Sequence, residues 1–498
     1  MIVKKQLLLL LVCLAAVTSE AKIYQNGQAF LADIGDGTTM VFQVIDWQAN
    51  TCMIGNPKVR INYEEEYLTY YQRVRSYTGE AAPTGTFTVP SKVTADNGVV
   101  YTVTKIGEFA FEDWTEATEF VLPPTITEIG WGAFLGCSAL KSLTVPEGVR
   151  TIGPKAFEMR FVGSGTDSTP DTSLEQITLP TTLDSIGSYA FQNCTRLKSI
   201  TLPAGFRALG LEVFSGCKSL TSFHLPAGVE YMRGGLFQNC PAMKTITVDA
   251  ANTHFDGRGG CNGIVEKQSQ TFVCGCSEST LPDGILAIGR DALRSYGKSS
   301  IRIPDGVKSI GNYAFYDAAL TTLDLPTSIR TLEGAAFQNC LITHLVLPLG
   351  LRSIGGYCFA NCPLVEVTIP ATVSEIGNSA FYNDRMTMPL ERVCCYVEKP
   401  FWINTDVFAH YGNYERPWTD ATLYVPQGTK ALYEAKNSWN KFSNIVENLE
   451  LVPTAISRHA DNAPSAMAAE YGVDGRQAMR SGLRITRLAD GTTRKTLR

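Results

Sequence analysis

The sequence predicts a repeat solenoid whose stacked units present a parallel β-sheet face. Three observations predict it. The motif Ile-Gly-x-x-Ala-Phe, or a close variant, recurs throughout residues 104–381. Most successive copies start 22 or 23 residues apart, which is a spacing typical of solenoids. An apolar-x-apolar-Pro segment precedes most copies by about ten residues.

The motif defines about 11 units of 22–23 residues. Its copies begin at Ile106, Ile129, Ile152, Ile186, Leu209, Met232, Ile288, Ile310, Leu332, Ile354 and Ile376. Two steps are longer, at 34 and 56 residues. They predict insertions near 158–173 and 249–285. A single unit cannot bury its apolar face, whereas stacked units bury a continuous core.

Each unit is expected to contain one short strand. In Leu143-Thr-Val-Pro146, as in the other copies, two apolar residues flank an outward-facing one, and proline then ends the strand because it lacks an N–H. A turn, a bend at the Ile-Gly pair and the Ala-Phe segment complete the unit. In this interpretation the glycines of the Ile-Gly pairs serve backbone turns.

The end of the motif predicts two internal columns. Ten of the eleven units have phenylalanine there and one has Leu293, which predicts a stacked aromatic spine. Six cysteines follow this position by three residues: Cys137, Cys194, Cys217, Cys240, Cys340 and Cys362. Their regular, inward-facing positions predict buried, mostly free thiols that pack as small apolar side chains.

These motifs resemble the bacterial BspA-like leucine-rich repeat, with the pattern L-x-x-I-x-I-P-x-x-V-x-x-I-G-x-x-A-F-x-x-C. The resemblance covers 104–381. Thr247–Pro282 is similar to a longer unit of that family, and Leu423–Lys430 with the residues after it resembles its closing segment. The resemblance implies a leucine-rich repeat right-handed superhelix with N- and C-terminal caps. It also implies surface display and adhesion to host extracellular proteins or to other cells.

The N-terminal region is expected to hold a leader and a cap. Residues 1–21 combine Lys4 and Lys5, an apolar run and a small-residue site ending at Ala21, which together predict a secretory signal peptide. A lipid-attachment cysteine at Cys13 is the alternative. Residues 22–103 show no period and alternate in places, which predicts a β-rich N-terminal cap.

The C-terminal region divides into three parts. Residues 382–455 are expected to close the repeats, and the Ala/Ser/Asp-rich segment 456–470 is interpreted as a linker. In 471–498, two alternating runs flank Asp490-Gly491, which predicts a hairpin. This tail resembles type IX secretion sorting signals, although Arg484 and Arg487 depart from that pattern. The alternative is a hairpin packed on a cap.

Charge excludes several classes of partner. The net charge is −5, the leader contributes +1 and residues 456–498 contribute +4, so residues 22–455 carry −10. An acidic body is a poor partner for nucleic acids or an anionic membrane. The sequence also contains no apolar run long enough for a transmembrane segment.

Catalytic and metal-binding signatures are missing from the sequence. Its five histidines form no H-E-x-x-H, and it has neither G-x-S-x-G nor a phosphate-binding loop. Cys261 with Cys274-Gly-Cys276, and Cys394-Cys395, lack the second ligand pair of a zinc site. The sequence therefore predicts no enzyme, cofactor or metal. An enzyme would need a site in 22–103 or 382–421.

Two surfaces are candidate binding sites. The exposed strand positions form mostly Ser/Thr rows, which simply suit an exposed strand. Charged or imidazole side chains interrupt them at His224, Arg302, Asp324, His344 and Glu366. The second is the aromatic loop at 408–418, with His410, Tyr411, Tyr414 and Trp418; packing within the cap is its alternative. The polar insertion 161–173 is a further protruding loop.

The predicted function is that of a non-catalytic exported or cell-surface protein that mediates adhesion through protein–protein interaction. The alternative is a surface glycan-binding protein that uses the aromatic loop. Its expected partners are host extracellular or cell-surface proteins, with glycans or other cells as alternatives.

Overall fold

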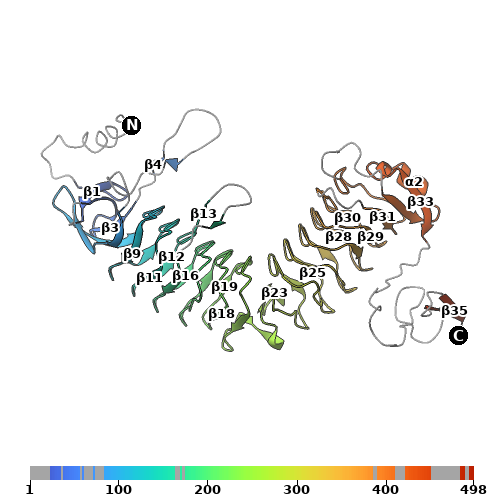
Figure 1. Ribbon diagram of the computed structural model, residues 1–498, viewed down its shortest axis with the longest axis horizontal. Helices are drawn as coiled ribbons and strands as arrows, with labels where there is room; N and C mark the ends of the chain where they lie inside the picture. The colour runs from blue at the N-terminus through green and yellow to red at the C-terminus, as the bar shows by residue number, and fades with distance from the viewer. Residues whose placement is uncertain are drawn as a thin grey trace. The chain divides into compact units, whose positions relative to one another are not determined.

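The computed structural model describes residues 23–34, 38–55, 59–60, 71–72, 83–162, 169–170, 174–384, 390–409, 421–449, 483–487 and 493–497. The chain forms two compact units, Met1–Gly257 and Arg258–Arg498. Figure 1 shows each unit as a series of stacked coils that carry short, parallel rungs. Repeated coils with parallel strands establish the predicted solenoid.

One ladder of short strands runs through the repeats of the first unit. It comprises β8 (Val100–Ile106), β10 (Glu128–Ile129), β12 (Thr151–Ile152), β16 (Ser185–Ile186), β17 (Ala208–Leu209) and β19 (Tyr231–Met232). Neighbours pair in parallel with each motif isoleucine, or its Leu or Met replacement, opposite the next.

The second unit repeats this arrangement. Its ladder runs through β22 (Ile264–Glu266), β23 (Thr271–Cys274), β24 (Ala287–Ile288), β25 (Ser309–Ile310), β26 (Thr331–Leu332), β28 (Ser353–Ile354) and β30 (Glu375–Ile376). From β23 onward all pairs are parallel.

The bend predicted at each Ile-Gly pair is wrong, because the first residue of the pair is the last residue of a ladder strand and the glycine follows it without a bend. The predicted apolar-x-apolar strands form in only some of the coils. They are β11 (Ser142–Thr144), β15 (Gln176–Thr178), β18 (Ser222–Leu225), β20 (Thr245–Val248), β27 (His344–Val346) and β29 (Glu366–Ile369). In three other coils the segments at 200–202, 301–303 and 323–325 keep the alternation without strand pairing. A three-residue strand ended by proline offers few ladder hydrogen bonds.

The motif glycines are required by close packing between coils and not by turns. A Cβ on Gly210 would lie 2.3 Å from the backbone N of Ser188, and one on Gly355 would lie 2.5 Å from the backbone C of Glu333. Neither glycine has a positive φ. The turn role predicted for these glycines is therefore wrong, since any side chain there would collide with the preceding coil.

Left-handed backbone occurs instead at two other positions of most coils. The residue before the Ala-Phe pair has positive φ in Tyr189, Tyr313 and Tyr357, and so does the residue before the cysteine in Asn193 and Asn339. Asn, Asp and Gly dominate the second position because they tolerate this conformation best.

The predicted phenylalanine spine is confirmed within each unit. In the first, Phe134 and Phe157 stack with ring centroids 5.1 Å apart and an interplanar angle of 7°. In the second, Phe315, Phe337, Phe359 and Phe381 stack at 5.2 to 5.8 Å with angles of 3–4°. Phe408 continues this row 5.1 Å from Phe381, one coil beyond the last recognised motif.

The predicted thiol column is confirmed, and the thiols also make hydrogen bonds. All six side chains are buried and are free thiols. Cys217 Sγ donates to the carbonyl of Phe191 at 3.2 Å, and Cys362 Sγ donates to that of Phe337 at 3.1 Å. The other four make the same bond to the preceding coil. Burial raises the pKa of four of them, namely Cys137, Cys194, Cys217 and Cys340.

Additional strands extend the first unit at its N-terminal side. There β1 (Ala29–Asp33), β2 (Thr39–Asp46) and β3 (Thr51–Ile54) pair antiparallel, and β3 joins β8 in parallel. The remaining strands of the unit are β4 (Val59–Arg60), β5 (Tyr71–Gln72), β6 (Gly85–Thr88), β7 (Lys92–Thr94), β9 (Ala117–Val121), β13 (Phe161–Val162), β14 (Thr169–Pro170) and β21 (Phe255–Asp256).

The segment after the last recognised motif joins the core of the second unit. It contains β31 (Arg392–Cys395), β32 (Thr422–Pro426), α2 (Lys430–Glu434), η3 (Trp439–Lys441) and β33 (Asn444–Leu449). Trp439 is fully buried and donates from Nε1 to the carbonyl of Phe401 at 2.9 Å. Beyond it, β34 (Leu483–Arg487) and β35 (Thr493–Leu497) pair antiparallel as the two strands of the predicted hairpin. Residues 1–22 and 450–482, with the leader and the linker, lie outside the described residues.

Candidate functional site

The exposed strand face is built by the simple alternation of the apolar-x-apolar segments. In β27 the side chain of Leu345 is buried, while His344 and Val346 on either side are exposed. The same in-and-out order holds at 142–144, 176–178 and 222–224. The outward row predicted from the sequence is therefore present, although its hydrogen-bonded strands are interrupted.

The strand face is continuous at the C-terminal end of the second unit. There β27, β29, β31, β32 and β33 form one five-stranded parallel sheet. Five outward side chains lie opposite one another across it, namely His344, Glu366, Arg392, Thr422 and Asn444. We call this set the C-terminal strand row. It brings together two of the five predicted strand-face residues.

The centre of the C-terminal strand row is held by Arg392. Its Nε lies 3.6 Å from Glu366 Oε1 and donates to Cys394 Sγ at 3.4 Å. Its guanidinium lies 4.3 Å from the ring centroid of Tyr424. The hydrogen bond with Cys394, followed by the charge of Glu366, raises the pKa of Arg392 further, so the cation is permanent. The Arg392 side chain remains 46% exposed and can reach a ligand.

The other predicted residues lie apart from this row. In the first unit His224 contacts Thr247 Oγ1 from Nδ1 at 2.9 Å and approaches Asp249 at 3.9 Å. In the second unit Arg302 pairs with Asp283 at 2.9 Å, and Asp324 is exposed. The five residues therefore do not form one site.

Arg392 and Tyr424 were not predicted as site residues. Arg392 directly precedes Val393-Cys-Cys395, and Tyr424 lies in Leu423-Tyr-Val-Pro426. Both segments fit the strand pattern, but no Ile-Gly-x-x-Ala-Phe motif follows them. The missing motif hid the two strands from the repeat count. Extending the apolar-x-apolar pattern past Phe381 would have found them.

The first two residues of the aromatic loop belong to the hydrophobic core. Phe408 stacks in the phenylalanine spine and Ala409 is buried, so the loop's first residues are structural. Its predicted binding residues His410, Tyr411, Tyr414 and Trp418 lie outside the described residues. The insertion loop is described only for the backbone of 161–162 and 169–170.

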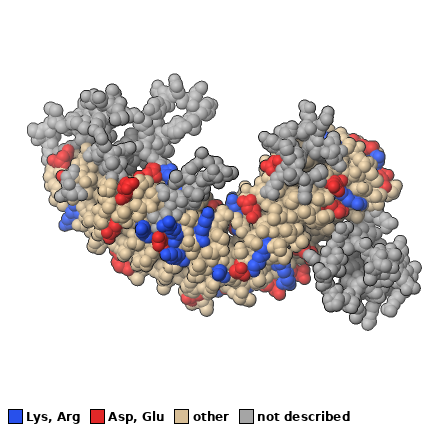
Figure 2. Space-filling model, in the orientation of Figure 1, with Lys and Arg blue, Asp and Glu red and all other residues tan. Residues whose placement is uncertain are grey.

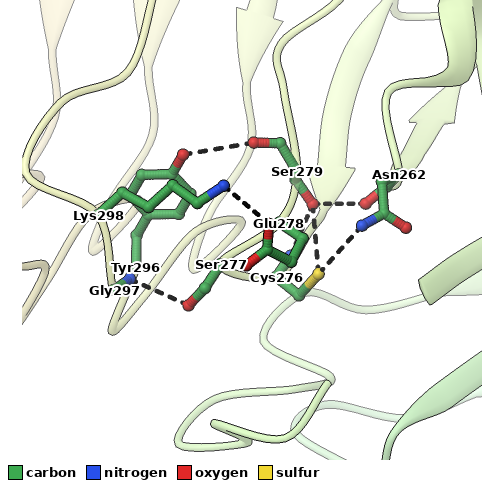
Figure 3. Close-up of polar contacts among 8 residues, drawn as sticks. All are labelled: Asn262, Cys276, Ser277, Glu278, Ser279, Tyr296, Gly297 and Lys298. Atoms are coloured by element: carbon green, nitrogen blue, oxygen red, sulfur yellow. Dashed lines mark hydrogen bonds and ion pairs between the residues drawn. The ribbon is translucent and has the colours of Figure 1, made fainter. Parts of the chain in front are cut away.

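In the longer unit, the region around Cys276 is held by hydrogen bonds that centre on Ser279 (Figure 3). Ser279 Oγ accepts from the backbone N of Cys276 at 2.8 Å and donates to the carbonyl of Asn262. Tyr296 O–H donates to the Ser279 carbonyl at 3.4 Å, and Lys298 Nζ pairs with Glu278 at 2.9 Å. These bonds fasten the turn onto the next coil.

The described residues contain neither a metal-binding cluster nor a membrane-spanning helix. No group of His, Cys, Asp and Glu there is arranged to hold a metal ion. Among the same residues, no helix has the length and apolar character needed to cross a bilayer.

Comparison with known proteins identifies the repeat. The BspA type leucine-rich repeat region matches residues 97–162, 169–258 and 268–387, over half of the chain. The chain belongs to the BspA-type leucine-rich repeat family. This assignment rests on the same coils that carry the glycine, phenylalanine and cysteine columns. A search of curated protein sequences gives no match.

One solved structure with a TM-score above 0.5 supports the fold, and two others are similar to the chain at lower scores. The pneumococcal vaccine antigen PcpA is 20% identical, with a TM-score of 0.60 over 86% of this chain and 100% of that one. A leucine-rich cell surface protein from Faecalibacterium prausnitzii is 23% identical, with a TM-score of 0.47 over 70% of this chain and 94% of that one. A leucine-rich repeat protein from Bacteroides ovatus is 21% identical, with a TM-score of 0.39 over 71% and 92%.

Proposed function

We propose that this BspA-type protein is exported, is displayed on the cell surface and mediates adhesion by binding a partner protein without catalysis. The single observation that supports this proposal best is the C-terminal strand row. It offers a cation, a carboxylate, an imidazole, a hydroxyl and an amide in one line on a rigid five-stranded sheet. Such a row can orient a partner by hydrogen bonds along an extended surface.

The chemistry of the row favours binding over turnover. Arg392 is already engaged with Glu366, Cys394 and Tyr424, so the row presents fixed polar groups. Neighbouring Cys394 is a poor nucleophile because burial raises its pKa. The sheet supplies a broad surface, and repeat proteins recognise partners by area. Arg and Tyr are also the residue types that dominate binding energy at interfaces.

The export route is part of the proposal. The leader predicted at 1–21 and the tail at 471–498 support passage to the surface. The right-handed coil and the caps expected of the family are also part of the proposal. Host extracellular proteins are the proposed partners. The glycan-binding alternative rests on the aromatic loop.

A paired screen tests the function. The full chain is applied to a panel of extracellular-matrix proteins and to a glycan array, and hits are measured by surface plasmon resonance. We expect a protein hit whose affinity falls about tenfold or more in the double variant Glu366→Ala/Arg392→Ala. The matched control, Thr144→Ala/Thr178→Ala, alters exposed strand-face residues of the first unit and should leave the affinity unchanged.

Two other outcomes of the screen would contradict the proposal. Hits confined to glycans would favour the aromatic-loop alternative. A protein hit weakened only by the Thr144→Ala/Thr178→Ala control would move the binding surface to the first unit.

A further inference from the structure

A column of three like charges stands on consecutive coils of the second unit. Lys308, Arg330 and Arg352 each come directly before the outward residue of a ladder strand. The backbone N of Arg330 donates to the carbonyl of Lys308 at 2.8 Å, and that of Arg352 donates to the carbonyl of Arg330 at 2.9 Å. The three residues are therefore direct neighbours, with backbones about 4.8 Å apart at each step. We call them the basic column.

The same position in the first unit is filled differently. It carries Arg150, Asp184, Arg207 and Glu230 on consecutive coils, so the charge alternates. Arg150 pairs with Asp184 at 3.1 Å, and Arg207 lies 3.7 Å from Glu230. In the first unit, opposite charges at this position pair with one another. In the second unit, three cations occupy it in succession.

The basic column has no carboxylate partner within the described part of the chain. Arg330 Nη1 donates to the carbonyls of Thr327 and Ile329 at 2.7 and 3.0 Å, so it braces its own turn. Lys308 and Arg352 are exposed and form no ion pair with a described residue. The nearby carboxylate of Glu333 accepts from the backbone N and Nδ2 of Asn312 instead.

Folding alone does not account for this column. Like charges opposite each other on neighbouring strands destabilise a sheet. The first unit shows that alternating charges fit the same position. A costly arrangement of exposed groups is typical of a functional surface, where stability is exchanged for binding.

The charges on the rest of the protein limit the ligand. Figure 2 shows red and blue side chains interspersed among uncharged residues over most of the described face in view. Residues 22–455 are acidic in sum. A long, uniformly charged polyanion would be repelled on either side of a column that spans only about 10 Å. A short acidic segment matches it, and guanidinium groups bind carboxylates with two parallel hydrogen bonds.

The geometry points to the basic column as a docking site for a short acidic segment of a partner protein. The half-buried hydroxyl residues Ser309, Thr331 and Ser353 follow the three cations and supply neutral donors beside them. The site lies across the proline turn from the strand face. It is thus a second contact, independent of the C-terminal strand row.

Binding of a fluorescein-labelled ten-residue glutamate peptide to the full chain, followed by anisotropy at low salt, tests the site. Lys308→Gln/Arg352→Gln keeps the bracing contacts of Arg330 and should weaken binding at least about fivefold. Arg150→Gln/Arg207→Gln removes the same charge from the matched position of the first unit and should change binding less than twofold. Equal losses in both variants would overturn the proposal, because they would show attraction by net charge alone.

A stability measurement provides the second readout. Lys308→Glu/Arg352→Glu gives the column the alternating order of the first unit, so it should raise the midpoint of thermal unfolding at low salt while abolishing peptide binding. The increase should disappear at about 1 M salt, where surface charges are screened. A lowered midpoint would overturn the functional explanation of the column. Tighter binding of labelled single-stranded DNA or a sulfated polysaccharide than of the peptide would overturn the choice of ligand.

Discussion

Gly210 shows how far a single methyl group can disturb the stack. A Cβ there would lie 2.3 Å from Ser188 N and 2.6 Å from Gly187 C, both backbone atoms of the preceding coil. Gly210→Ala should therefore cost about 1–3 kcal/mol of unfolding free energy, because the coils must separate to admit the methyl group. Urea unfolding followed by circular dichroism measures this.

Gly205 is the matched control for that substitution. It lies five residues earlier in the same chain segment, has no positive φ, and a Cβ there would meet nothing within 4 Å. Gly205→Ala should leave the stability unchanged or raise it by up to about 1 kcal/mol. Equal effects of the two substitutions would contradict the close packing assigned to the glycine column.

Phe337 tests the aromatic spine in the same way. It is fully buried between Phe315 and Phe359, whose rings lie 5.2 and 5.3 Å away. Phe337→Ala should cost about 3–5 kcal/mol, because the flanking coils are fixed by their ladder and cannot close the cavity. Denaturant unfolding measures the loss. Leu341→Ala, at a 43% exposed position of the same coil, should cost less than about 0.5 kcal/mol.

At the scale of the element, the thiol column should make stability fall at alkaline pH. Burial keeps the pKa of Cys194 and Cys217 well above the value of about 8.5 found in unfolded chains. The thiols contribute fully below pH 8.5. Above it the unfolded chain releases protons that the folded protein retains, so the free energy of unfolding falls by up to about 1.4 kcal/mol per thiol and pH unit.

Chemical unfolding between pH 8 and 9.5 measures this slope. The triple variant Cys194→Ala/Cys217→Ala/Cys240→Ala should show a shallower fall over the same range, whatever its stability at pH 7. An unchanged slope would mean that other groups titrate there and that the thiols do not.

The repeating elements were predictable because each coil repeats the same physical constraints. The period, the inward phenylalanines, the buried thiols and the outward strand positions all follow from residue type and spacing. The Ile-Gly ladder was mistaken for a bend, since a two-residue strand leaves no alternation to detect. The hydrogen bonds of the ladder are made to neighbouring coils. The glycine column is likewise required by close contact between coils.

The candidate site was only half predictable. His344 and Glu366 lie within recognised repeats, where the strand pattern is followed by the motif. Arg392 and Tyr424 belong to strands without the motif, and Tyr424 lies 30 residues beyond Cys394. Only the register of β31 and β32 reveals that Arg392 joins the row, and Tyr424 lies beneath its guanidinium without belonging to the row.

At the scale of the whole molecule, the tail is expected to direct export while the body folds without it. The hypothesis rests on the linker composition of 456–470, the paired strands β34 and β35, and the change from an acidic body to a basic tail. Deleting 471–498 should leave the thermal midpoint of the body within about 2 °C. The same deletion should strand the protein inside the envelope of its native host.

Calorimetry measures the thermal midpoint, and surface labelling of intact cells measures display. As a control, replacing 471–498 with a Gly/Ser segment of equal length should behave like the deletion. A large drop in midpoint with surface display intact would make the tail a structural part of the fold.

The two-residue rungs have a mechanical consequence. Each of β24, β25, β26, β28 and β30 pairs with the neighbouring rung over only two residues. Under a pull along the stacking axis, coils can therefore detach one after another, because each coil touches only the coils beside it. A released coil of 22 residues can extend to about 75 Å. In the proposed adhesive role, a cell held through this protein in flowing liquid would be tethered by a chain that lengthens in steps before it breaks.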